Sequence, residues 1–362
     1  MPRFEARRDR LRKTLKKSGA DALLVTNFTN VTYLTGFTGD DSYLLLWRNG
    51  QVILSDPRYT TQLEEQCPGL DLEIRPPGTN MLDSIARAVR EAKTHRLGVE
   101  AESMTVGLRD RISAELPQVE AVATSGLIEQ LREVKDAEEI SQLREAIWYA
   151  EKAFGVLRAS LTLEKTEKQV AAELEHQMRL FGARGYSFPS IVAAGSRAAL
   201  PHATPTDRLS GEGDLLLVDW GADGGLYKSD LTRVLVTGKI SPKLERVYRV
   251  VLSAQEQAIA AIRPGVAAQD VDAVARGVIE QAGFGRYFGH GLGHGLGLEV
   301  HEAPRLTARN AALLKPGMVV TVEPGIYLPG WGGVRIEDDV LVTRTGCEVL
   351  TSVPKQWNDS VC

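Results

Sequence analysis

The sequence predicts a two-domain α/β protein, and three observations support this fold class. The chain has 362 residues, a length that favours two domains and a large buried core. Short apolar strands alternate with helices over the first third, and long helices separate strand blocks from about residue 136 onward. Hydrophobic residues make up 43% and charged residues 25% of the chain, as is typical of an ordinary globular protein.

The first domain is expected over residues 1–125, as a compact α/β unit with a mixed sheet. In its basic N-terminal segment Phe4, Leu11 and Leu15 share one helical face, which suggests a docked surface helix. Strands are expected at DALLVTN, SYLLLW, QVILS and LGVE. Helices are expected around 57–66, 79–94 and 105–116.

The second domain is expected over residues 126–362. The charged helical stretch SGLIEQLREVKDAEEI is expected to form the junction between the two domains. The dipeptides Pro264-Gly265 and Pro316-Gly317 each close one element before the next begins. Long helices are expected at 136–159, 166–182, 241–262 and 268–282.

Two segments of the second domain look like copies of one β-hairpin that carries two acids. LLLVDWGADGGLYKSDLTRVLVTG holds Asp219 and Asp230, and MVVTVEPGIYLPGWGGVRIEDDVLVTRTG holds Glu323 and Glu337. Each segment begins as an apolar strand, breaks at glycine and returns as an alternating strand. An acid among buried apolar residues is costly unless it is paired, hydrogen-bonded or bound to metal, so four such acids point to metal.

A histidine also lies upstream of each hairpin, His202 in one half and His301 in the other. Each half therefore consists of a helix, a histidine loop, an acidic strand, a turn and a second acidic strand. Any two hairpins resemble each other, but the matching histidines favour a true repeat. The second domain is thus expected to be pseudo-two-fold, with the acids converging near its axis.

The loop GHGLGHGLGLEVHE, residues 289–302, holds three of the chain's six histidines beside the acidic hairpins. It does not fit G-x-G-x-x-G, so dinucleotide binding is not expected. H-E-x-x-H also fails, because His301-Glu302 is followed by Ala-Pro-Arg, and this excludes the common single-zinc protease helix. The nucleophile motif G-x-S-x-G is absent as well.

The four acids and His294 form a coherent set of metal ligands. Two divalent cations would neutralise four carboxylates and leave open positions for water and substrate, whereas one cation would leave the site strongly anionic. Oxygen-rich ligation with a single nitrogen suits Mn²⁺ or Co²⁺, with Zn²⁺ as a further option. Two such ions bridged by carboxylates can lower the pKa of a shared water and polarise a substrate carbonyl.

Charge and cysteine content narrow the remaining function classes. The net charge of −4 gives no basic field for nucleic acid or an anionic membrane. No apolar run is long enough to span a bilayer, and no secretory h-region follows the basic N-terminus. Cys67, Cys347 and Cys362 are widely spaced and form no C-x-x-C pair, as expected of incidental thiols in a reducing compartment. A cytoplasmic location is expected.

Several of these motifs together resemble the signature of the M24 "pita-bread" metallopeptidases, in the group of proline-specific enzymes that includes prolidase and aminopeptidase P. The motifs are His202, Asp219, Asp230, GHGLGHGLG, His301-Glu302, TVEPGIY and GGVRIEDD. TNVTYLTGF and SDPRYT in the first domain look like the smaller bacterial and archaeal Xaa-Pro peptidases. The resemblance implies a creatinase-type, ribonuclease-H-like mixed α/β domain followed by a pita-bread catalytic domain.

The resemblance also implies roles for single residues. Asp230 and Glu337 would bridge both metal ions, and Glu323 would also carry a proton from the attacking water to the leaving nitrogen. The full set of dimetal ligands would be Asp219, Asp230, His294, Glu323 and Glu337.

Other motif positions are expected to contact substrate. His290 and His301 resemble histidines that contact the scissile carbonyl and stabilise the tetrahedral intermediate. His202 resembles the histidine near the proline and its carboxylate side, and Arg335 resembles an arginine that orders the substrate. Arg309 lies about where some prolidases carry a carboxylate-binding arginine, although Arg305 is close to it in the same loop.

The expected reaction is hydrolysis of Xaa-Pro bonds by a hydroxide that bridges two metals. Xaa-Pro dipeptidase is the leading assignment, and Xaa-Pro aminopeptidase, which acts on tripeptides and longer chains, is the alternative. A non-peptide amidohydrolase and a metal-free binding protein of the same fold are two further alternatives. A homodimer is expected, with Asn30, Tyr33 and Arg58 as loop candidates for a lid over the partner's site.

Overall fold

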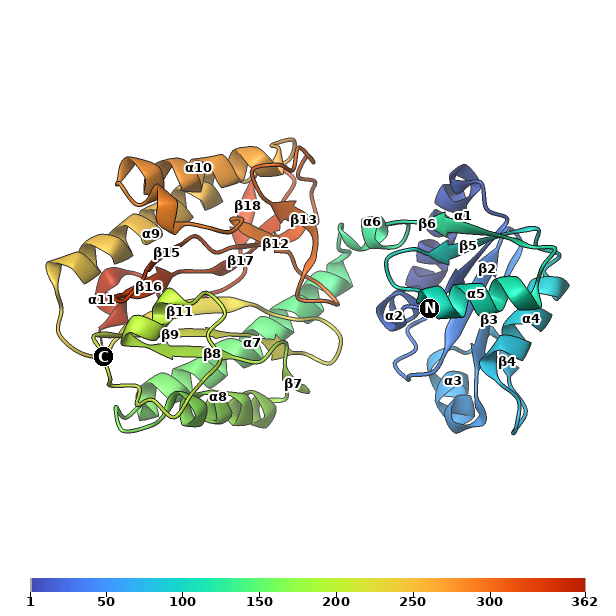
Figure 1. Cartoon of the computed structure of the whole chain (residues 1–362), viewed down its shortest axis with the longest axis horizontal. Helices are drawn as coiled ribbons and strands as arrows, with labels where there is room; N and C mark the ends of the chain where they lie inside the picture. Colours follow the sequence, from blue (N-terminus) through green and yellow to red (C-terminus); the bar gives the residue numbers. More distant parts are fainter. Residues whose placement is uncertain (1, 362) are drawn as a thin grey trace. The chain divides into compact units, whose positions relative to one another are not determined.

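The computed structural model describes residues 2–361 (Figure 1). The chain divides into two compact units, residues 1–132 and 133–362. The division therefore comes a few residues after the boundary expected between 125 and 126. Within the described part of the chain, no helix is long and apolar enough to cross a membrane.

The first unit is built on a six-stranded mixed sheet with the strand order β4-β3-β2-β1-β5-β6. The neighbours β1, β2 and β3 pair antiparallel, whereas the β3–β4, β1–β5 and β5–β6 pairs are parallel. The four strands expected from sequence are the inner ones. The strands are β1 (Ala22–Val25), β2 (Tyr43–Trp47), β3 (Gly50–Ser55), β4 (Asp71–Ile74), β5 (Arg96–Glu100) and β6 (Glu120–Thr124).

Helices flank this sheet in the order that the strand–helix alternation implies. The N-terminal helix docks through Leu11 and Leu15, which are fully or almost fully buried. The helices are α1 (Pro2–Ser18), α2 (Phe28–Thr35), the 3₁₀ turn η1 (Pro57–Tyr59), α3 (Thr60–Gln66), α4 (Met81–Glu91), α5 (Val106–Glu115) and α6 (Glu129–Arg132).

Helix α2 corrects the expectation that Asn30 and Tyr33 lie on a loop. Both residues are within the helix and almost fully buried. Asn27 caps the helix start through its side chain, and Gly36 ends the helix in a left-handed conformation. Arg58 is exposed, as a lid residue would be, but it forms ion pairs with two acids of its own unit.

The second unit has two halves, each with a pair of long helices against strands (Figure 1). Helices α7 (Ala137–Ser160) and α8 (Glu167–Phe181) pack on the first half, and α9 (Pro242–Ala261) and α10 (Ala268–Gln281) on the second. Side chains of Asp136 and Thr166 begin α7 and α8 with capping boxes, so these starts follow directly from the sequence. The prediction of a mixed α/β fold with a repeated second domain is confirmed.

The strands of the second unit form two main sheets, with the orders β11-β9-β8 and β13-β12-β14-β17-β18, and two short pairs, β10-β7 and β15-β16. The first half has β7 (Gly185–Tyr186), β8 (Ile191–Ala194), η2 (Gly195–Ala199), β9 (Leu215–Trp220), β10 (Ala222–Asp223) and β11 (Leu231–Val236). The second half has η3 (Gly285–Tyr287), β12 (Gly293–Gly295), β13 (Glu302–Leu306), β14 (Val319–Val322), β15 (Gly325–Leu328), β16 (Gly332–Arg335), β17 (Asp338–Val342), β18 (Cys347–Val349) and α11 (Trp357–Ser360).

The cysteines of the described chain have free thiols, as expected for Cys67 and Cys347. Cys362 lies outside the described residues.

In both acidic hairpins each acid lies at or near the end of a strand pairing. In the first, β9 pairs with β11, and Asp230 immediately precedes β11. In the second, β14 pairs with β17 and then β15 with β16, so Glu323 and Glu337 fall where one pairing gives way to the other. The ends of these pairings bring the acids of both halves to one cavity.

A single β-bridge joins the two main sheets, between Thr232 and Glu337. The Glu337 amide donates to the Thr232 carbonyl at 3.2 Å, and the Thr232 hydroxyl donates to the Glu337 carboxylate at 2.6 Å. One of the acids expected to bind metal therefore also takes part in a backbone link between the halves.

Gly293 is required where β12 pairs with β14, because a Cβ there would lie 2.0 Å from the Thr321 carbonyl oxygen. We expect Gly293→Ala to lower the free energy of unfolding by about 1–3 kcal/mol, since the two strands must separate to admit the methyl group. Gly277→Ala is the matched control, because its Cβ meets open space in helix α10. That variant should be stabilised by about 0.5–1 kcal/mol. Urea denaturation measures both, and equal stability of the two variants would contradict the steric argument.

Candidate functional site

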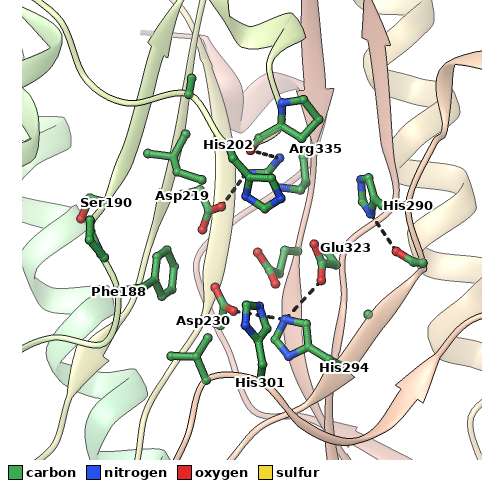
Figure 2. A pocket seen from close by; sticks show the side chains of 18 of the residues that line it. Phe188, Ser190, His202, Asp219, Asp230, His290, His294, His301, Glu323 and Arg335 are labelled. Carbon is green, nitrogen blue, oxygen red and sulfur yellow. Dashed lines mark hydrogen bonds and ion pairs between the residues drawn. The ribbon is translucent and has the colours of Figure 1, made fainter.

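A cavity of about 480 Å³ lies between the two halves of the second unit (Figure 2). All five residues expected to bind metal line it, as do the three expected substrate histidines and Arg335. In Figure 2, Asp219 and Asp230 point in from one side, and Glu323 and His294 from the other.

Three of the expected ligands are close enough to hold one ion together. One ligand atom each of Asp230, His294 and Glu337 lies within 4.8 Å of the other two, and all three residues are buried. The Nε2 atom of His294 is 3.6 Å from an oxygen of Asp230 and 3.3 Å from one of Glu323. Expected ligands from both halves thus lie close to one another.

The protonation state of His294 suits a metal ligand. Its Nδ1 lies 3.1 Å from the Gly295 carbonyl oxygen, which can only accept, so Nδ1 carries the proton. Burial, followed by the nearby His301, lowers the pKa of His294 to about 3, so the ring is neutral. The Nε2 lone pair is then free and faces the carboxylates, as an imidazole ligand requires.

The acids of the cavity are held in an environment that lacks sufficient positive charge. Burial raises the pKa of Asp230 and of Glu337 well above the ordinary carboxyl value, and the neighbouring carboxylates raise both further. Burial also raises the pKa of Glu323, to about 7. In addition, Asp219 Oδ1 is buried without a hydrogen-bond partner. Such a donor set fits divalent cations, which would supply the missing charge and occupy the unpaired oxygen.

Arg335 is the cation nearest these acids and connects several parts of the site. Its guanidinium donates to Asp219 at 2.5 Å, to the Thr232 hydroxyl at 3.1 Å and to the Tyr327 hydroxyl at 2.8 Å. Arg335 is only 3% exposed, so these interactions are made away from solvent. One positive charge does not balance four carboxylates, which is consistent with metal supplying the rest.

His290 has both ring nitrogens engaged. Nδ1 lies 2.8 Å from the Gly291 carbonyl oxygen and so carries a proton, and Nε2 lies 2.9 Å from the Tyr327 hydroxyl. Burial lowers the pKa of His290 to about 4. The neutral ring therefore accepts the Tyr327 hydroxyl proton, while Tyr327 accepts from Arg335.

His202 and His301 are exposed at the cavity wall. The His301 ring packs edge-on against His294, with 4.4 Å between ring centroids. Burial, with a contribution from Arg305, lowers the pKa of His301. Within the described chain no hydrogen bond to the His301 ring is found, so its nitrogens can face a ligand.

Arg305 rather than Arg309 lines the cavity. Both are exposed, and Arg305 lies on β13, three residues after the buried Glu302. The structure thus brings together every expected site residue except Arg309.

Sequence reasoning did not single out Tyr327, Thr232 or Asp339. Tyr327 falls within the TVEPGIY motif, and Thr232 lies two residues after Asp230, so their places in the motifs could have indicated both. Asp339 accepts a hydrogen bond from the Asp230 amide at 3.2 Å, and its other oxygen is buried without a partner. Only the folded structure reveals that contact.

Comparisons with known proteins identify the family of this chain. A family model for Creatinase/Prolidase N-terminal domains matches residues 7–134, and one for Metallopeptidase family M24 matches residues 141–344. An uncharacterized peptidase of Bacillus subtilis is 42% identical over 96% of this chain and 98% of its own.

Solved structures extend the likeness to the whole fold. The Xaa-Pro dipeptidase from Bacillus anthracis has a TM-score of 0.95 and 38% identity, covering 99% of this chain and 100% of that one. The X-Pro aminopeptidase from Thermotoga maritima has a TM-score of 0.88 and 37% identity, covering 95% and 99%. Together with the residues gathered in the cavity, these matches confirm the resemblance seen in the sequence motifs. The chain belongs to metallopeptidase family M24.

Proposed function

We propose that this protein is a metal-dependent Xaa-Pro dipeptidase. The observation that carries the proposal is the convergence of four acids and one neutral histidine in a single cavity. The volume of that cavity, about 480 Å³, suits a small substrate. The solved dipeptidase that matches over the full chain supports the choice of substrate.

The ligands in this proposal are the five that sequence indicated, with Asp230 and Glu337 as the bridging pair. Bound divalent ions would polarise the scissile carbonyl and acidify a water molecule, and the oxygen-rich donor set favours Mn²⁺ or Co²⁺ over Zn²⁺. The ligands are Asp219, Asp230, His294, Glu323 and Glu337.

The remaining steps belong to the protein's own side chains. Glu323 accepts a proton from the attacking water, and its place beside the Thr321 hydroxyl at 3.3 Å orients the carboxylate. Water adds its oxygen to the carbonyl carbon, the C–N bond breaks, and Glu323 passes the proton to the proline nitrogen. His301 donates a hydrogen bond to the carbonyl oxygen as charge develops there.

The other residues bind and orient the substrate. We assign His202 to the proline side of the cavity. Arg335 holds the acids and the Tyr327 hydroxyl in position through its hydrogen bonds. His290 enters the proposal as a neutral wall of the cavity, because Gly291 and Tyr327 already engage its nitrogens. A contact from His290 to the carbonyl would require release of Tyr327.

Proline makes this chemistry useful. A peptide bond to proline has no N–H, so a peptidase that relies on binding that donor rejects it. Polarisation of the carbonyl needs no such donor.

Substrate length separates the two candidate activities. A dipeptide presents its carboxylate directly after proline, and Arg305 on the cavity wall provides a cation to bind it. Cleavage of longer peptides is the second candidate activity, because the similar Thermotoga maritima structure is described as an X-Pro aminopeptidase. The homodimer, the cytoplasmic location and the domain limits at 125 and 126 stay predictions from the sequence.

Asp230→Ala should abolish turnover of Ala-Pro and remove Mn²⁺ binding, because the variant lacks the acid at the centre of the ligand cluster. Asp223→Ala is the control, since Asp223 lies on the same hairpin but pairs with Lys228. Isothermal titration of metal-free protein with Mn²⁺ measures binding independently of activity. Retained binding in Asp230→Ala would show that the ligand assignment is wrong.

Metal uptake should release protons, and affinity should rise as pH increases through about 7. The cause is that burial raises the pKa of Glu323 to about 7 and those of Asp230 and Glu337 well above their usual range, so metal displaces bound protons. Calorimetric titration in two buffers with different ionisation enthalpies counts the protons. Glu323→Gln should release fewer, and an enthalpy independent of buffer would contradict the expectation.

Arg305→Met should reduce kcat/KM for Ala-Pro by about 10-fold, the typical loss of one charge-assisted hydrogen bond. The amide Ala-Pro-NH₂ lacks the carboxylate and should be affected much less. Arg309→Met, four residues away and outside the cavity wall, is the matched control. A loss in Arg309→Met alone would reverse the assignment, and equal wild-type rates on Ala-Pro and Ala-Pro-Ala would favour the aminopeptidase.

A further inference from the structure

An ion pair on helix α10 makes contacts that an ordinary helical salt bridge does not make. Asp272 and Arg276 lie four residues apart, and the Asp272 side chain is fully buried while that of Arg276 is 31% exposed. The guanidinium binds both carboxylate oxygens at 2.9 Å. The pair is thus held in one bidentate geometry, which fixes the direction of the remaining donors.

Those donors reach the loop of residues 288–292, which carries His290. Arg276 Nη1 donates to the Phe288 carbonyl at 3.0 Å, and Nη2 donates to the His290 carbonyl at 2.9 Å. The Leu292 amide is shared between Asp272 at 3.1 Å and the Leu306 carbonyl at 2.8 Å. One ion pair therefore forms hydrogen bonds with backbone groups of three alternate residues of the loop.

The same pair also acts on the rings of the loop. The Arg276 guanidinium lies over the Phe288 ring, 4.4 Å from its centroid. Phe288 in turn packs edge-on against His290, with 5.1 Å between centroids and an interplanar angle of 86°. The Leu292 carbonyl then accepts from the Glu323 amide at 2.8 Å, so the loop is tied to a candidate metal ligand.

We propose that Asp272 and Arg276 are positioning residues that hold the loop 288–292, and with it His290, in place against the cavity. Helix α10 is a suitable base because its residues Val271, Ala275 and Ile279 are buried in the core. The position of the loop is a property of the fold, whereas its effect on catalysis rests on the proposed Xaa-Pro activity.

A comparison within the chain shows why this pair differs from a surface one. Arg249 and Glu245 on α9 have the same spacing, but the Arg249 side chain is 57% exposed. Among the described residues, these two side chains form hydrogen bonds only with each other. Exposed pairs of this kind contribute little. Arg276, by contrast, has every one of its bonded groups in the interior or in the loop.

Arg276→Lys tests the proposal without leaving Asp272 unpaired, which could unfold the protein. A lysine can pair with Asp272, but its one nitrogen cannot occupy the three positions from which the guanidinium nitrogens contact Asp272 and the Phe288 and His290 carbonyls. Arg249→Lys is the matched control. The first measurement is amide hydrogen exchange across residues 288–292, with residues 215–220 as an internal reference for global stability.

Exchange in the loop should become about 10-fold faster in Arg276→Lys and stay unchanged at the reference strand. Unchanged exchange in the loop would overturn the proposal, and so would an equal rise at residues 215–220. The control variant should match wild type in both segments.

The second measurement is the ratio of kcat/KM for Ala-Pro to that for Ala-pipecolic acid, whose ring is one carbon larger. This ratio does not depend on the fraction of active enzyme, so a merely structural defect leaves it unchanged. We expect it to fall in Arg276→Lys, while kcat/KM for Ala-Pro falls by up to about 100-fold, as for a misplaced cavity wall. An unchanged ratio would overturn the role in catalysis. Wild-type protein that cleaves neither substrate with Mn²⁺ would instead refute the proposed function, and exchange would still decide the position of the loop.

Discussion

Mutual repulsion among four clustered carboxylates, three of them buried, is the constraint on which the second unit depends. These acids meet beside the β-bridge between Thr232 and Glu337, and Glu337 belongs to both the bridge and the cluster. Burial without compensation would drive protons onto the acids, as the raised pKa values of Asp230 and Glu337 indicate. Arg335 offsets part of the charge, and the remainder makes the cluster a site for cations.

The polar groups around the cluster each hold a different member of it in place. Gly295 fixes the tautomer of His294, and Asp339 holds the backbone of Asp230. Thr232 of the first half accepts from Arg335 and donates to Glu337, and so connects a cation and an acid of the second half. The proposed metal site would need little rearrangement on ion binding, because its expected ligands already line one cavity.

Much of this arrangement could be predicted from sequence, because paired motifs carry local information. The acidic hairpins, the long helices and the two-domain division follow from apolar patterns, glycine breaks and capping residues. Helix α2 was missed because its sequence, FTNVTYLT, is rich in β-branched residues, and only its caps and burial make it helical. Arg305 and Arg309 are equally plausible in sequence, since loop geometry decides which one faces the cavity. The Asp272–Arg276 contacts to the histidine loop require tertiary structure.

The bridge between the halves also governs the order in which the site can be completed during synthesis. Thr232 forms a hydrogen bond with Glu337, which is synthesised 105 positions later. Asp219 forms one with Arg335, which is synthesised 116 positions later. At ribosomal rates this separation corresponds to roughly 5–20 s. Throughout that interval the first hairpin presents two acids and an unmatched sheet edge. Because Asp219 and Asp230 precede Glu323 and Glu337 by about a hundred positions, the proposed metal site can be completed only after most of the chain has been synthesised.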